Sequence, residues 1–323
     1  MLPQRYSIDS LLNALRNPSE LYKEAIRVLD QIRFQATHEP AIDVMAQDWD
    51  YLLILDACRY DVFKEINWIN GKLDAVISAG SHSEEFFEVN FAGRSFYDTV
   101  YVTANAFGAR IGDGVFHDLI YTGGEIDEDF VGWHSVSERM EAETIYNKTL
   151  DAIEQYPNKR IISHFMQPHT PYFGDKAEKI RERVEKDGLI VRSRQSEKVE
   201  KYSLDDENVV VSLKEAAEKG YITHSEIKEL YIKNLRIVLE YIESLVEKLD
   251  GKIVITADHG EFLGENGKLG HPKYTYSEVV RKVPWLVIES DNRPEITDAG
   301  SSKRADVSEK NIESHLRDLG YKE

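Results

Sequence analysis

The stretch Gly251–Pro284, GKIVITADHGEFLGENGKLGHPKYTYSEVVRKVP, decides the fold. Its first part, Lys252–Ala257, is a short apolar run rich in β-branched residues, which predicts a buried strand. Asp258 and His259 follow that strand directly, and ligands in open α/β sheets collect just past the carboxyl ends of strands. Adjacent Asp and His side chains on irregular backbone can both turn toward one cation. His271 ends the glycine-rich loop that follows.

This stretch resembles the second metal-binding segment of the sulfatase-like branch of the alkaline phosphatase superfamily. In that family a strand ends in S/T-x-D-H-G-E, a glycine loop reaches a Lys or His, and the chain returns through an R-x-V-P strand. ITADHGEFLGENGKLGH and YSEVVRKVPWLVI carry these pieces in order, with His271 at the Lys/His position. The resemblance implies a three-layer α/β/α fold with a mixed, mostly parallel central sheet. Without the surrounding motif, an Asp-His pair after a strand would be read as a polar loop.

The composition indicates a globular protein. The 323 residues are 41% hydrophobic, which suits one large α/β domain with additions. The formal net charge of −18 disfavours nucleic acid or an anionic membrane as a partner, and an anionic substrate would need local positive charge from a metal, Arg or His. The single cysteine, Cys58, fits a reducing compartment. No apolar run approaches the ~20 residues of a membrane span and no signal peptide is evident, so we expect a cytoplasmic protein.

A second apolar strand is predicted at Asp50–Leu55, directly before Asp56. LLILDACRYDVF resembles the first segment of the same superfamily, where an apolar strand delivers an Asp to the metal. The resemblance implies metal ligation by Asp56; the alternative is a turn in which Asp56 or Asp61 caps the next helix. Many sulfatases carry two consecutive Asp residues here, but this chain has Ala57 in the second place, which implies a thinner coordination shell. Arg59 would bind either a substrate oxyanion or a structural carboxylate.

A third predicted strand, Asp74–Ser78, leads into the small-residue loop that carries the nucleophile in the family. Sulfatases need a cysteine there, in C-x-P/A-x-R, which is converted to formylglycine. This loop has no cysteine, so formylglycine chemistry is not expected. Relatives that transfer phosphoryl groups have Ser or Thr at this point; Ser83 aligns best, and Ser81 is the second candidate. At a helix start, backbone amides would help to ionise the hydroxyl, although both serines could act only as helix caps.

HFMQPHTPYFG, which begins inside the predicted strand Arg160–Phe165, resembles the family's H-x-x-x-P-H-x-P-Y segment. The second histidine of that segment, here His169, faces the transferred group, where an imidazole can stabilise charge or protonate the leaving oxygen. His164 should support the site from the core. Two-metal alkaline phosphatases bind their second cation with an Asp and a His spaced four apart, and Phe165 stands at that Asp position. We therefore expect one metal ion, with His169 and His271 doing the electrostatic and proton-transfer work.

The rest of the chain is interpreted from its periodicity. Residues 97–105 predict a strand ending at Asn105, which contacts the substrate or forms a turn, the commoner role of this residue type. Residues 106–136 read as a long surface loop, and 176–230 as a charged helical insertion near the mouth of the site. An apolar stripe over 230–249 predicts a long amphipathic core helix.

These patterns predict three regions. They are an N-terminal helical extension (1–45), an alkaline phosphatase-like catalytic domain (46–290, with 176–230 inserted) and a C-terminal tail with a short helix (291–323). We expect the N-terminal helices and the insertion on one side of the sheet.

Together the motifs predict a metal-dependent hydrolase or transferase that acts on phosphate mono- or diesters through a covalent phosphoserine. Asp56, Asp258, His259 and the oxygen of Ser83 would bind one divalent cation. An imidazole ligand favours Mn, Zn or Mg over Ca. After attack by Ser83, the remaining side chains with predicted roles would assist the leaving group or contact the substrate: His271 for the leaving group, and His169, Arg59 and Asn105 for the substrate.

Other functions remain open at this level. A sulfate or phosphonate ester hydrolase on the same scaffold is the nearest alternative, and a non-catalytic binding protein that retains the fold is another. A phosphoglycerol-type transferase is disfavoured by the lack of a predicted membrane segment. The expected substrate is a small-molecule or a glycan- or lipid-derived anionic ester. The sequence predicts neither its identity nor the oligomeric state.

Overall fold

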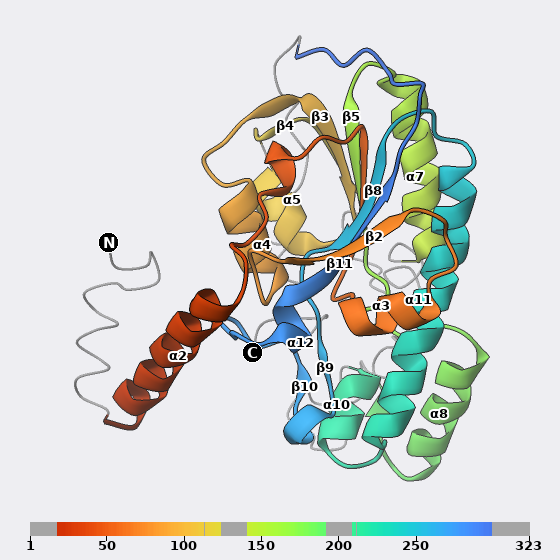
Figure 1. Ribbon diagram of the computed structural model, residues 1–323. Helices are drawn as coiled ribbons and strands as arrows, with labels where there is room; N and C mark the ends of the chain where they lie inside the picture. The colour runs from red at the N-terminus through yellow and green to blue at the C-terminus, as the bar shows by residue number, and fades with distance from the viewer. Residues whose placement is uncertain (1–17, 113, 124–140, 192–208, 211, 299–323) are drawn as a thin grey trace.

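The protein is built around a seven-stranded sheet with helices on both faces (Figure 1). The computed structural model describes residues 18–112, 114–123, 141–191, 209–210 and 212–298. The strand order is β2-β11-β8-β1-β5-β3-β4. The strands are β1 (Tyr51–Leu55), β2 (Lys72–Ile77), β3 (Phe96–Thr103), β4 (Phe116–Tyr121), β5 (Arg160–Phe165), β8 (Ile253–Ala257) and β11 (Lys282–Ile288).

The sheet is mixed and mostly parallel, as predicted. Only β11 runs against its neighbours, β2 and β8; the other pairs in the sheet are parallel. The central strands end in register, with Leu55 of β1 opposite both Phe165 of β5 and Ala257 of β8. The residues that follow these three strands therefore emerge side by side at one edge of the sheet.

Alternation along β1 divides the core between the two faces of the sheet. Leu53 and Leu55 join the larger apolar cluster, which also contains residues of α3 (Tyr60–Ile66), α7 (Ala142–Gln155) and α11 (His224–Val246). Leu52 and Ile54 point the other way, into a cluster with α4 (Ser83–Asn90) and α5 (Ala106–Gly112). Because side chains of a strand alternate between faces, one apolar run can fill both clusters. The predicted three-layer α/β/α fold is thus confirmed.

The long helix α11 starts earlier than the predicted 230–249. Thr223 caps it: the Thr223 hydroxyl accepts from the Glu226 amide, and the Glu226 carboxylate accepts from the Thr223 amide. This capping box satisfies free amides at the helix start and fixes the first turn there. The predicted apolar stripe faces the core, because Leu235, Leu239 and their neighbours on that face are buried.

The insertion is only partly helical. It contains α8 (Asp175–Lys186), β6 (Ile190–Val191), β7 (Val209–Val210) and α10 (Leu213–Glu218), and β6 pairs with β7 in parallel. The predicted helical insertion therefore also contains two short strands that the sequence did not predict. The strands are two residues long, too short for a period-2 pattern to appear in the sequence.

The predicted surface loop at 106–136 is wrong in its first half. α5 and β4 lie within it, and β4 adds the edge strand beside β3. Phe116 and Leu119 of β4 are buried against the α4–α5 face. Residues 124–136, like the predicted C-terminal helix and the first helix of the N-terminal extension, lie outside the described residues.

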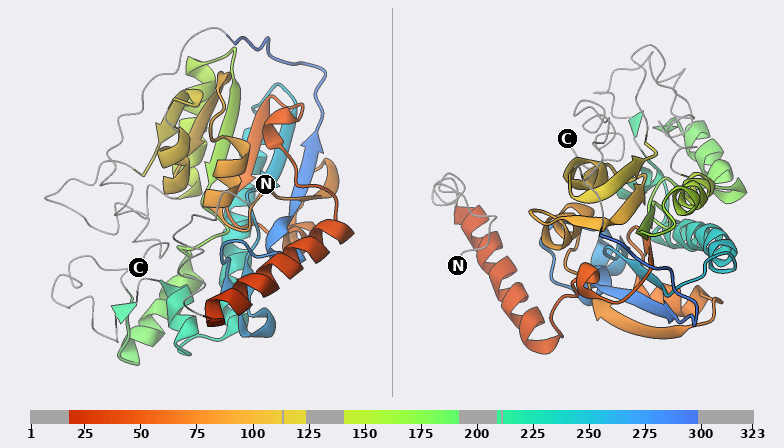
Figure 2. Two further views of the ribbon diagram at one scale, coloured as in Figure 1. Left: turned by 90° about the vertical axis from the view of Figure 1, so that its left-hand side faces the viewer. Right: turned by 90° about the horizontal axis from the view of Figure 1, so that it is seen from above.

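The remaining elements surround the site or the N-terminus. They are α2 (Pro18–Thr37), η1 (Val44–Ala46), β9 (Phe262–Leu263), η3 (Glu265–Gly267), β10 (Leu269–Gly270) and α12 (Glu278–Arg281). α2 projects from the body and lies across the molecule from α8 (Figures 1 and 2), so the extension and the insertion do not share one side. His38, which directly follows α2, contacts Glu278 at the start of α12. Among the described helices, none is both long and apolar enough to span a bilayer.

Candidate active site

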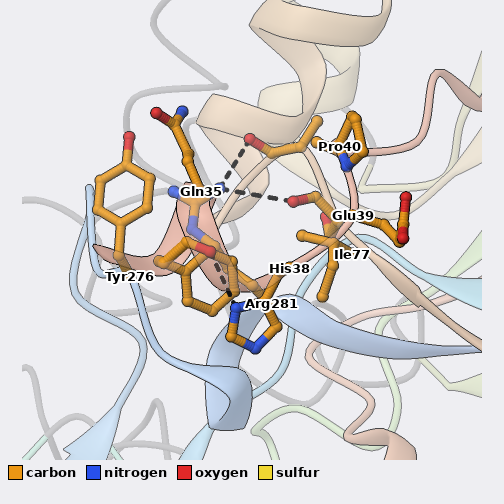
Figure 3. Close-up of a pocket in the computed structure, with 11 residues that line it drawn as sticks. Gln35, His38, Glu39, Pro40, Ile77, Tyr276 and Arg281 are labelled. Carbon is orange, nitrogen blue, oxygen red and sulfur yellow. Dashed lines mark hydrogen bonds between the residues drawn. The ribbon is translucent and has the colours of Figure 1, made fainter. Parts of the chain in front are cut away.

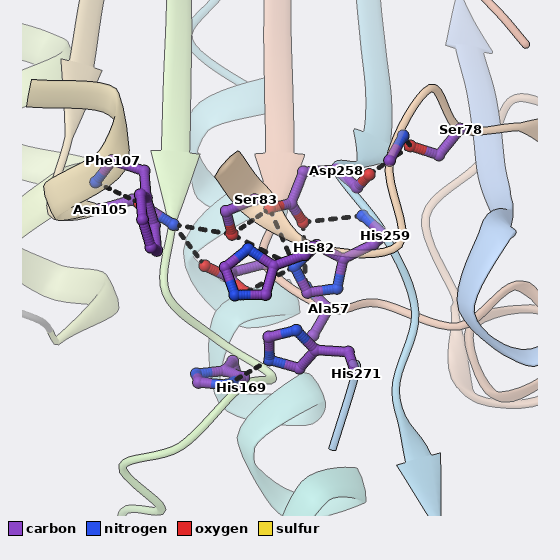
Figure 4. A network of polar contacts seen from close by, with 12 residues as sticks. Ala57, Ser78, His82, Ser83, Asn105, Phe107, His169, Asp258, His259 and His271 are labelled. Carbon is purple, nitrogen blue, oxygen red and sulfur yellow. Dashed lines mark hydrogen bonds and ion pairs between the residues drawn. The ribbon is translucent and has the colours of Figure 1, made fainter. Parts of the chain in front are cut away.

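The predicted site residues converge at the carboxyl edge of the sheet (Figure 4). They come from the loops after β1, β2, β3, β5 and β8, which the register of the strands places together. The side chains are buried, between 0% and 7% exposed: Asp56, Ser83, Asn105, His169, Asp258, His259 and His271. Of the predicted site residues, only Arg59 has its charged group directed elsewhere.

Asp56 and Asp258 place two buried carboxylates close together. Burial first, and then the charge of Asp258, raise the pKa of Asp56 well above its usual range. Asp56 Oδ2 accepts a hydrogen bond from Asn105 Nδ2 at 2.8 Å, but Asp56 Oδ1 has no donor among the described residues. An unpaired buried carboxylate oxygen is costly, and a cation between the two acids would remove that cost.

His259 is oriented as a metal-binding imidazole. Its Nδ1 lies 3.0 Å from the Gly260 carbonyl, which can only accept, so Nδ1 carries the hydrogen and Nε2 keeps its lone pair. Nε2 lies 3.3 Å from Asp258 Oδ2 and 3.8 Å from Asp56 Oδ1. Gly260 has no room for a side chain, since a Cβ there would stand 2.2 Å from the Val279 carbonyl oxygen.

Ser83 faces this group from the first turn of α4. Its Oγ donates to Asp258 Oδ2 at 2.7 Å and lies 3.2 Å from His259 Nε2. Asn105 Nδ2 approaches the same Oγ at 3.1 Å. The cap of α4 is His82, whose Nδ1 accepts from the Glu84 amide, so neither serine acts as the helix cap. Ser83 is therefore free of a capping role, and its hydroxyl lies among the candidate ligands.

Ser81, the second candidate nucleophile, has a different setting. Its hydroxyl contacts the Glu85 carboxylate at 3.2 Å and the Pro272 carbonyl at 3.0 Å, and it accepts from the Thr275 amide at 3.0 Å. These bonds join the loop before α4 to the segment after His271. The geometry favours Ser83 over Ser81 as the group that faces the carboxylates.

Asn105 combines the two roles open to it. Its Oδ1 accepts from the Phe107 amide at 2.9 Å, which is the turn expected of an Asn after a strand. Its Nδ2 donates to both Asp56 and Ser83. The amide thus orients one candidate ligand and the candidate nucleophile at once.

His169 and His271 form a buried imidazole pair at the mouth of this group (Figure 4). Their Nε2 atoms are 3.0 Å apart, and His169 Nδ1 lies 2.8 Å from the Thr170 carbonyl. Because that carbonyl accepts, His169 carries its hydrogen on Nδ1, and His271 Nε2–H is the donor between the rings. Burial is the main cause that lowers the pKa of both histidines well below the usual value.

Glu261 is a candidate site residue that the sequence reading missed. It is 1% exposed, and within the described residues neither of its carboxylate oxygens has a hydrogen-bond partner. Burial raises its pKa to about 7. One ligand atom from each of His169, Glu261 and His271 lies within 4.8 Å of the others. Phe165 therefore does not by itself exclude a second cation, because Glu261 can supply the missing carboxylate. In the sequence, the signal for this residue was the position of Glu261 directly after Asp258-His259-Gly260.

Arg59 binds structural carboxylates. Its guanidinium contacts Asp61 at 2.7 and 2.9 Å, Glu265 at 2.5 Å and the Glu261 carbonyl at 3.3 Å. Of its two predicted roles, these contacts support binding to structural carboxylates. Arg59 also occupies the cap position of α3, so neither Asp56 nor Asp61 caps that helix with its side chain.

His82 and His164 are two further buried histidines close to the candidate ligands. The His82 ring centroid is 5.1 Å from that of His271, and burial lowers the pKa of His82 to about 2. The sequence reading missed His82, although it directly precedes Ser83. His164 bonds to the Tyr101 hydroxyl at 2.7 Å, and its Nε2 is 3.8 Å from Asp258 Oδ2. This is the supporting position expected of it.

The residues present fit one divalent cation. One ligand atom from each of Asp56, Asp258 and His259 lies within 4.8 Å of the others, and the Ser83 oxygen stands beside two of them. Two carboxylates, an imidazole and a hydroxyl form a mixed oxygen–nitrogen set of the kind that Zn²⁺ and Mn²⁺ accept. The orphaned Asp56 Oδ1 gives such an ion an open ligand.

A pocket of about 410 Å³ lies between the end of α2 and β2, beside the start of the loop that leads to Ser83 (Figure 3). Arg281 borders it and donates to the Ala79 carbonyl at 3.0 Å and to the Glu85 carboxylate at 2.8 Å. The lining includes Ser78 and Ala79 but none of the candidate ligands. This pocket is therefore separate from the carboxylate and histidine group.

The solved structures that resemble this chain are remote from it in sequence. No curated protein matches the sequence. Among solved structures, the chain is similar to the soluble domain of lipooligosaccharide phosphoethanolamine transferase A from Neisseria meningitidis, at 12% identity and a TM-score of 0.44, covering 75% of this chain and 76% of that one. It is also similar to a protein in the alkaline phosphatase superfamily from Vibrio parahaemolyticus, at 12% identity and a TM-score of 0.42, covering 92% and 75%.

A phosphonate monoester hydrolase from Silicibacter pomeroyi is a third structural relative, at 16% identity and a TM-score of 0.31, covering 57% of this chain and 38% of that one. The sulfatase family profile matches residues 86–318, well over half of the chain, although Asp56 and Ser83 precede the matched span. The buried Asp258–His259 pair and both histidines of the mouth lie inside it. The chain belongs to the sulfatase family.

Proposed function

We propose that this protein is a metal-dependent hydrolase or transferase of phosphate mono- or diesters, with Ser83 as its nucleophile. The observation that carries the proposal is the position of the Ser83 hydroxyl, within 3.2 Å of both Asp258 Oδ2 and His259 Nε2. A buried hydroxyl at a helix start, among two carboxylates and an imidazole, is the arrangement that serine nucleophiles of this kind need.

Asp56, Asp258, His259 and the Ser83 oxygen would hold one divalent cation. When bound, such an ion lowers the pKa of the hydroxyl and neutralises charge on the transferred group. Asp258 Oδ2 already accepts the hydrogen of Ser83, so it orients the hydroxyl and is placed to receive the proton. Asn105 holds the serine oxygen from the other side.

The first chemical step forms a bond from Ser83 Oγ to phosphorus while the bond from phosphorus to the leaving oxygen breaks. The serine proton passes to Asp258. An anionic substrate raises the pKa of His271 and so favours its doubly protonated form. From that form, Nε2–H, which points to His169 in the free site, would give its proton to the leaving oxygen and leave a neutral imidazole. His169 would contact the oxygens of the transferred group. Burial lowers the pKa of His169, and binding of an anionic substrate would raise that pKa again.

The second step releases the group. Water or another alcohol attacks phosphorus, the bond to Ser83 Oγ breaks, and the serine recovers a proton from Asp258. The attacking water or alcohol gives its proton to His271, which lost a proton in the first step. With water the product is a free phosphate or phosphomonoester; with an alcohol the protein acts as a transferase.

The absence of cysteine from the loop Ala79–Glu85 supports phosphorus over sulfur, since formylglycine has no precursor there. A sulfate or phosphonate ester hydrolase remains the nearest alternative. Turnover of matched aryl phosphate, phosphonate and sulfate esters separates the three. A non-catalytic binding protein would turn over none of them with Mn²⁺, Zn²⁺ or Mg²⁺ supplied.

The substrate class follows from charge. We propose a small-molecule or a glycan- or lipid-derived anionic ester, and a cytoplasmic location. The net charge of −18 opposes nucleic acid, so positive charge at the site must select the anion locally. Lys214 and Lys273 lie close enough to act electrostatically on His82 and are candidates for this role.

The test is a substitution series assayed on a panel of phosphomonoesters and diesters. Ser83→Ala and Asp258→Ala should each abolish turnover, and Ser244→Ala is the matched control because its hydroxyl is exposed on α11 and donates to the Glu240 carbonyl of the same helix. Unchanged hydrolysis in both site variants would refute the proposal.

A further inference from the structure

The core helix α11 contacts three of the loops that form the site. Tyr231 and Asn234 are one turn apart on its buried face, and both are 0% exposed. Nearer the helix start, His224 packs against Gly264 in the loop between β8 and His271. A Cβ on Gly264 would stand 2.6 Å from that of His224, and its φ of +119° also requires glycine.

Tyr231 holds the loop that carries Asp56. Its hydroxyl donates to the Ala57 carbonyl at 2.7 Å and accepts from the Arg59 amide at 2.9 Å. Ala57 has a φ of +59°, a left-handed conformation that costs energy for any residue with a Cβ. Two bonds from one hydroxyl satisfy the backbone on both sides of Cys58 and so hold this strained turn next to Asp56.

Asn234 holds the loop that carries His169. Its Nδ2 lies 3.1 Å from the His169 carbonyl and 2.9 Å from the Pro171 carbonyl, and its Oδ1 accepts from the Phe173 amide at 2.9 Å. A third carbonyl, of Pro168, is 3.4 Å away. One side chain thus binds backbone groups on both sides of the histidine. Prolines on either side of His169 have no amide hydrogen, so this turn depends on such outside partners.

We infer that Tyr231 and Asn234 are positioning residues, which set the metal-binding loop and the histidine loop at a fixed separation on one rigid helix. The inference rests on the proposed function for its chemistry, but the geometry that it describes does not. Supporting groups of this kind fix the orientation of ligands, and their loss typically costs about 10–100-fold in metal affinity or activity.

The two residues should affect different steps. Tyr231→Phe removes both bonds to the Asp56 loop, so Mn²⁺ or Zn²⁺ affinity should fall by about 10–100-fold. Asn234→Ala releases the His169 turn and leaves the Asp56 loop in place. Its metal affinity should stay within about threefold of the parent, while kcat falls by about 10–100-fold with little change in KM.

Ile242→Val is the matched control. Ile242 is buried on the same helix and touches neither loop through a hydrogen bond, so its truncation costs stability without altering the site. All three variants would be compared in the full chain by chelator competition with each metal, by steady-state kinetics and by hydrogen exchange of the segments 56–59 and 168–173.

The inference predicts a crossed pattern. Tyr231→Phe should raise exchange in 56–59 only, and Asn234→Ala in 168–173 only. If both variants change metal affinity, kcat and exchange no more than Ile242→Val does, the residues are ordinary core and the inference fails. If the parent protein turns over no ester, the proposed function fails, while metal affinity and exchange still decide whether α11 positions the loops.

Discussion

The Ser83 hydroxyl donates a hydrogen bond to Asp258 Oδ2 across 2.7 Å, although the two residues are 175 positions apart in the chain. The other oxygen of Asp258 accepts from the Ala57 amide at 3.1 Å and from the His259 amide at 2.9 Å. One carboxylate therefore ties the nucleophile loop, the turn after β1 and its own strand end together. The proposed role of Ser83 as the nucleophile depends on this carboxylate.

Asp258→Asn should prevent metal binding. The amide supplies no negative charge, and loss of a direct ligand should exceed the 10–100-fold cost of losing a supporting group, so we expect affinity for Mn²⁺ or Zn²⁺ to fall at least ~100-fold. Chelator competition measures it. Asp151→Asn is the control, because Asp151 is exposed and pairs with Lys148 three positions earlier. Equal affinity in the Asp258 variant and the parent would count against the ligand assignment.

Ser81→Ala should reduce stability but spare the chemistry. The change removes a hydroxyl that links the Glu85 carboxylate, the Pro272 carbonyl and the Thr275 amide, and unsatisfied buried groups cost about 1–3 kcal/mol. Urea denaturation should show that loss, while kcat stays within about tenfold because no catalytic oxygen is removed. Complete inactivation by Ser81→Ala at full metal occupancy would transfer the nucleophile role from Ser83 to Ser81.

The sequence predicted the sheet and most of the site. Central parallel strands are short, apolar and β-branched, and Asp56 and Asp258 come directly after two of them. The roles predicted for these residues and for His169 came from the resemblance of the three segments to the family's motifs. The sequence did not predict the short strands β6 and β7, because a strand of two residues is too short to show alternating hydrophobicity. It also missed the early start of α11, because the capping residues Thr223 and Glu226 precede the apolar stripe that defined the predicted helix.

What the sequence could not show is which polar atoms face each other. Tyr231 lies within an apolar stripe and was read as core; its hydroxyl acts on a loop far away in the chain. Glu261 received no predicted role, yet it is buried next to His169 and His271. From the sequence, Arg59 could bind either a substrate or a structural carboxylate. The positions of Asp61 and Glu265 in the structure favour the structural carboxylate.

Arg281→Met should destabilise the fold strongly. Arg281 and Glu85 form an ion pair at 2.8 Å with side chains 5% and 7% exposed. Removing the cation leaves Glu85 buried without its partner, which typically costs about 3–5 kcal/mol in unfolding free energy. Chemical denaturation measures the change. The double variant Arg281→Met/Glu85→Gln should recover part of it, and a loss under ~1 kcal/mol for the single variant would show that the pair contributes little.

The pair of Arg183 and Glu226 should give a small, pH-dependent stabilisation. Its hydrogen bond to Arg183 lowers the pKa of Glu226 to about 2, so the folded state holds the carboxylate ionised more firmly than the unfolded chain does. This contribution is fully present above the ordinary Glu pKa of ~4.3 and disappears as pH falls toward 2. Since the pair is partly exposed, about 0.2–1 kcal/mol is expected.

Glu226→Gln isolates that charge, because Gln can replace Glu in the capping box at the start of α11. The difference in unfolding free energy between the parent and this variant should be measurable at neutral pH and vanish near pH 2. A difference that is unchanged, or that grows, on acidification would contradict the assigned direction.

The most direct test of the central claim is mass spectrometry of the protein quenched in acid during turnover of an activated aryl phosphate with Mn²⁺ or Zn²⁺. The account predicts one added phosphoryl group on the peptide that contains Ser83, located on Ser83 by fragmentation and absent from Ser83→Ala. Phosphate release with no adduct under conditions where breakdown of the adduct is slow, or an adduct on another residue, would contradict it.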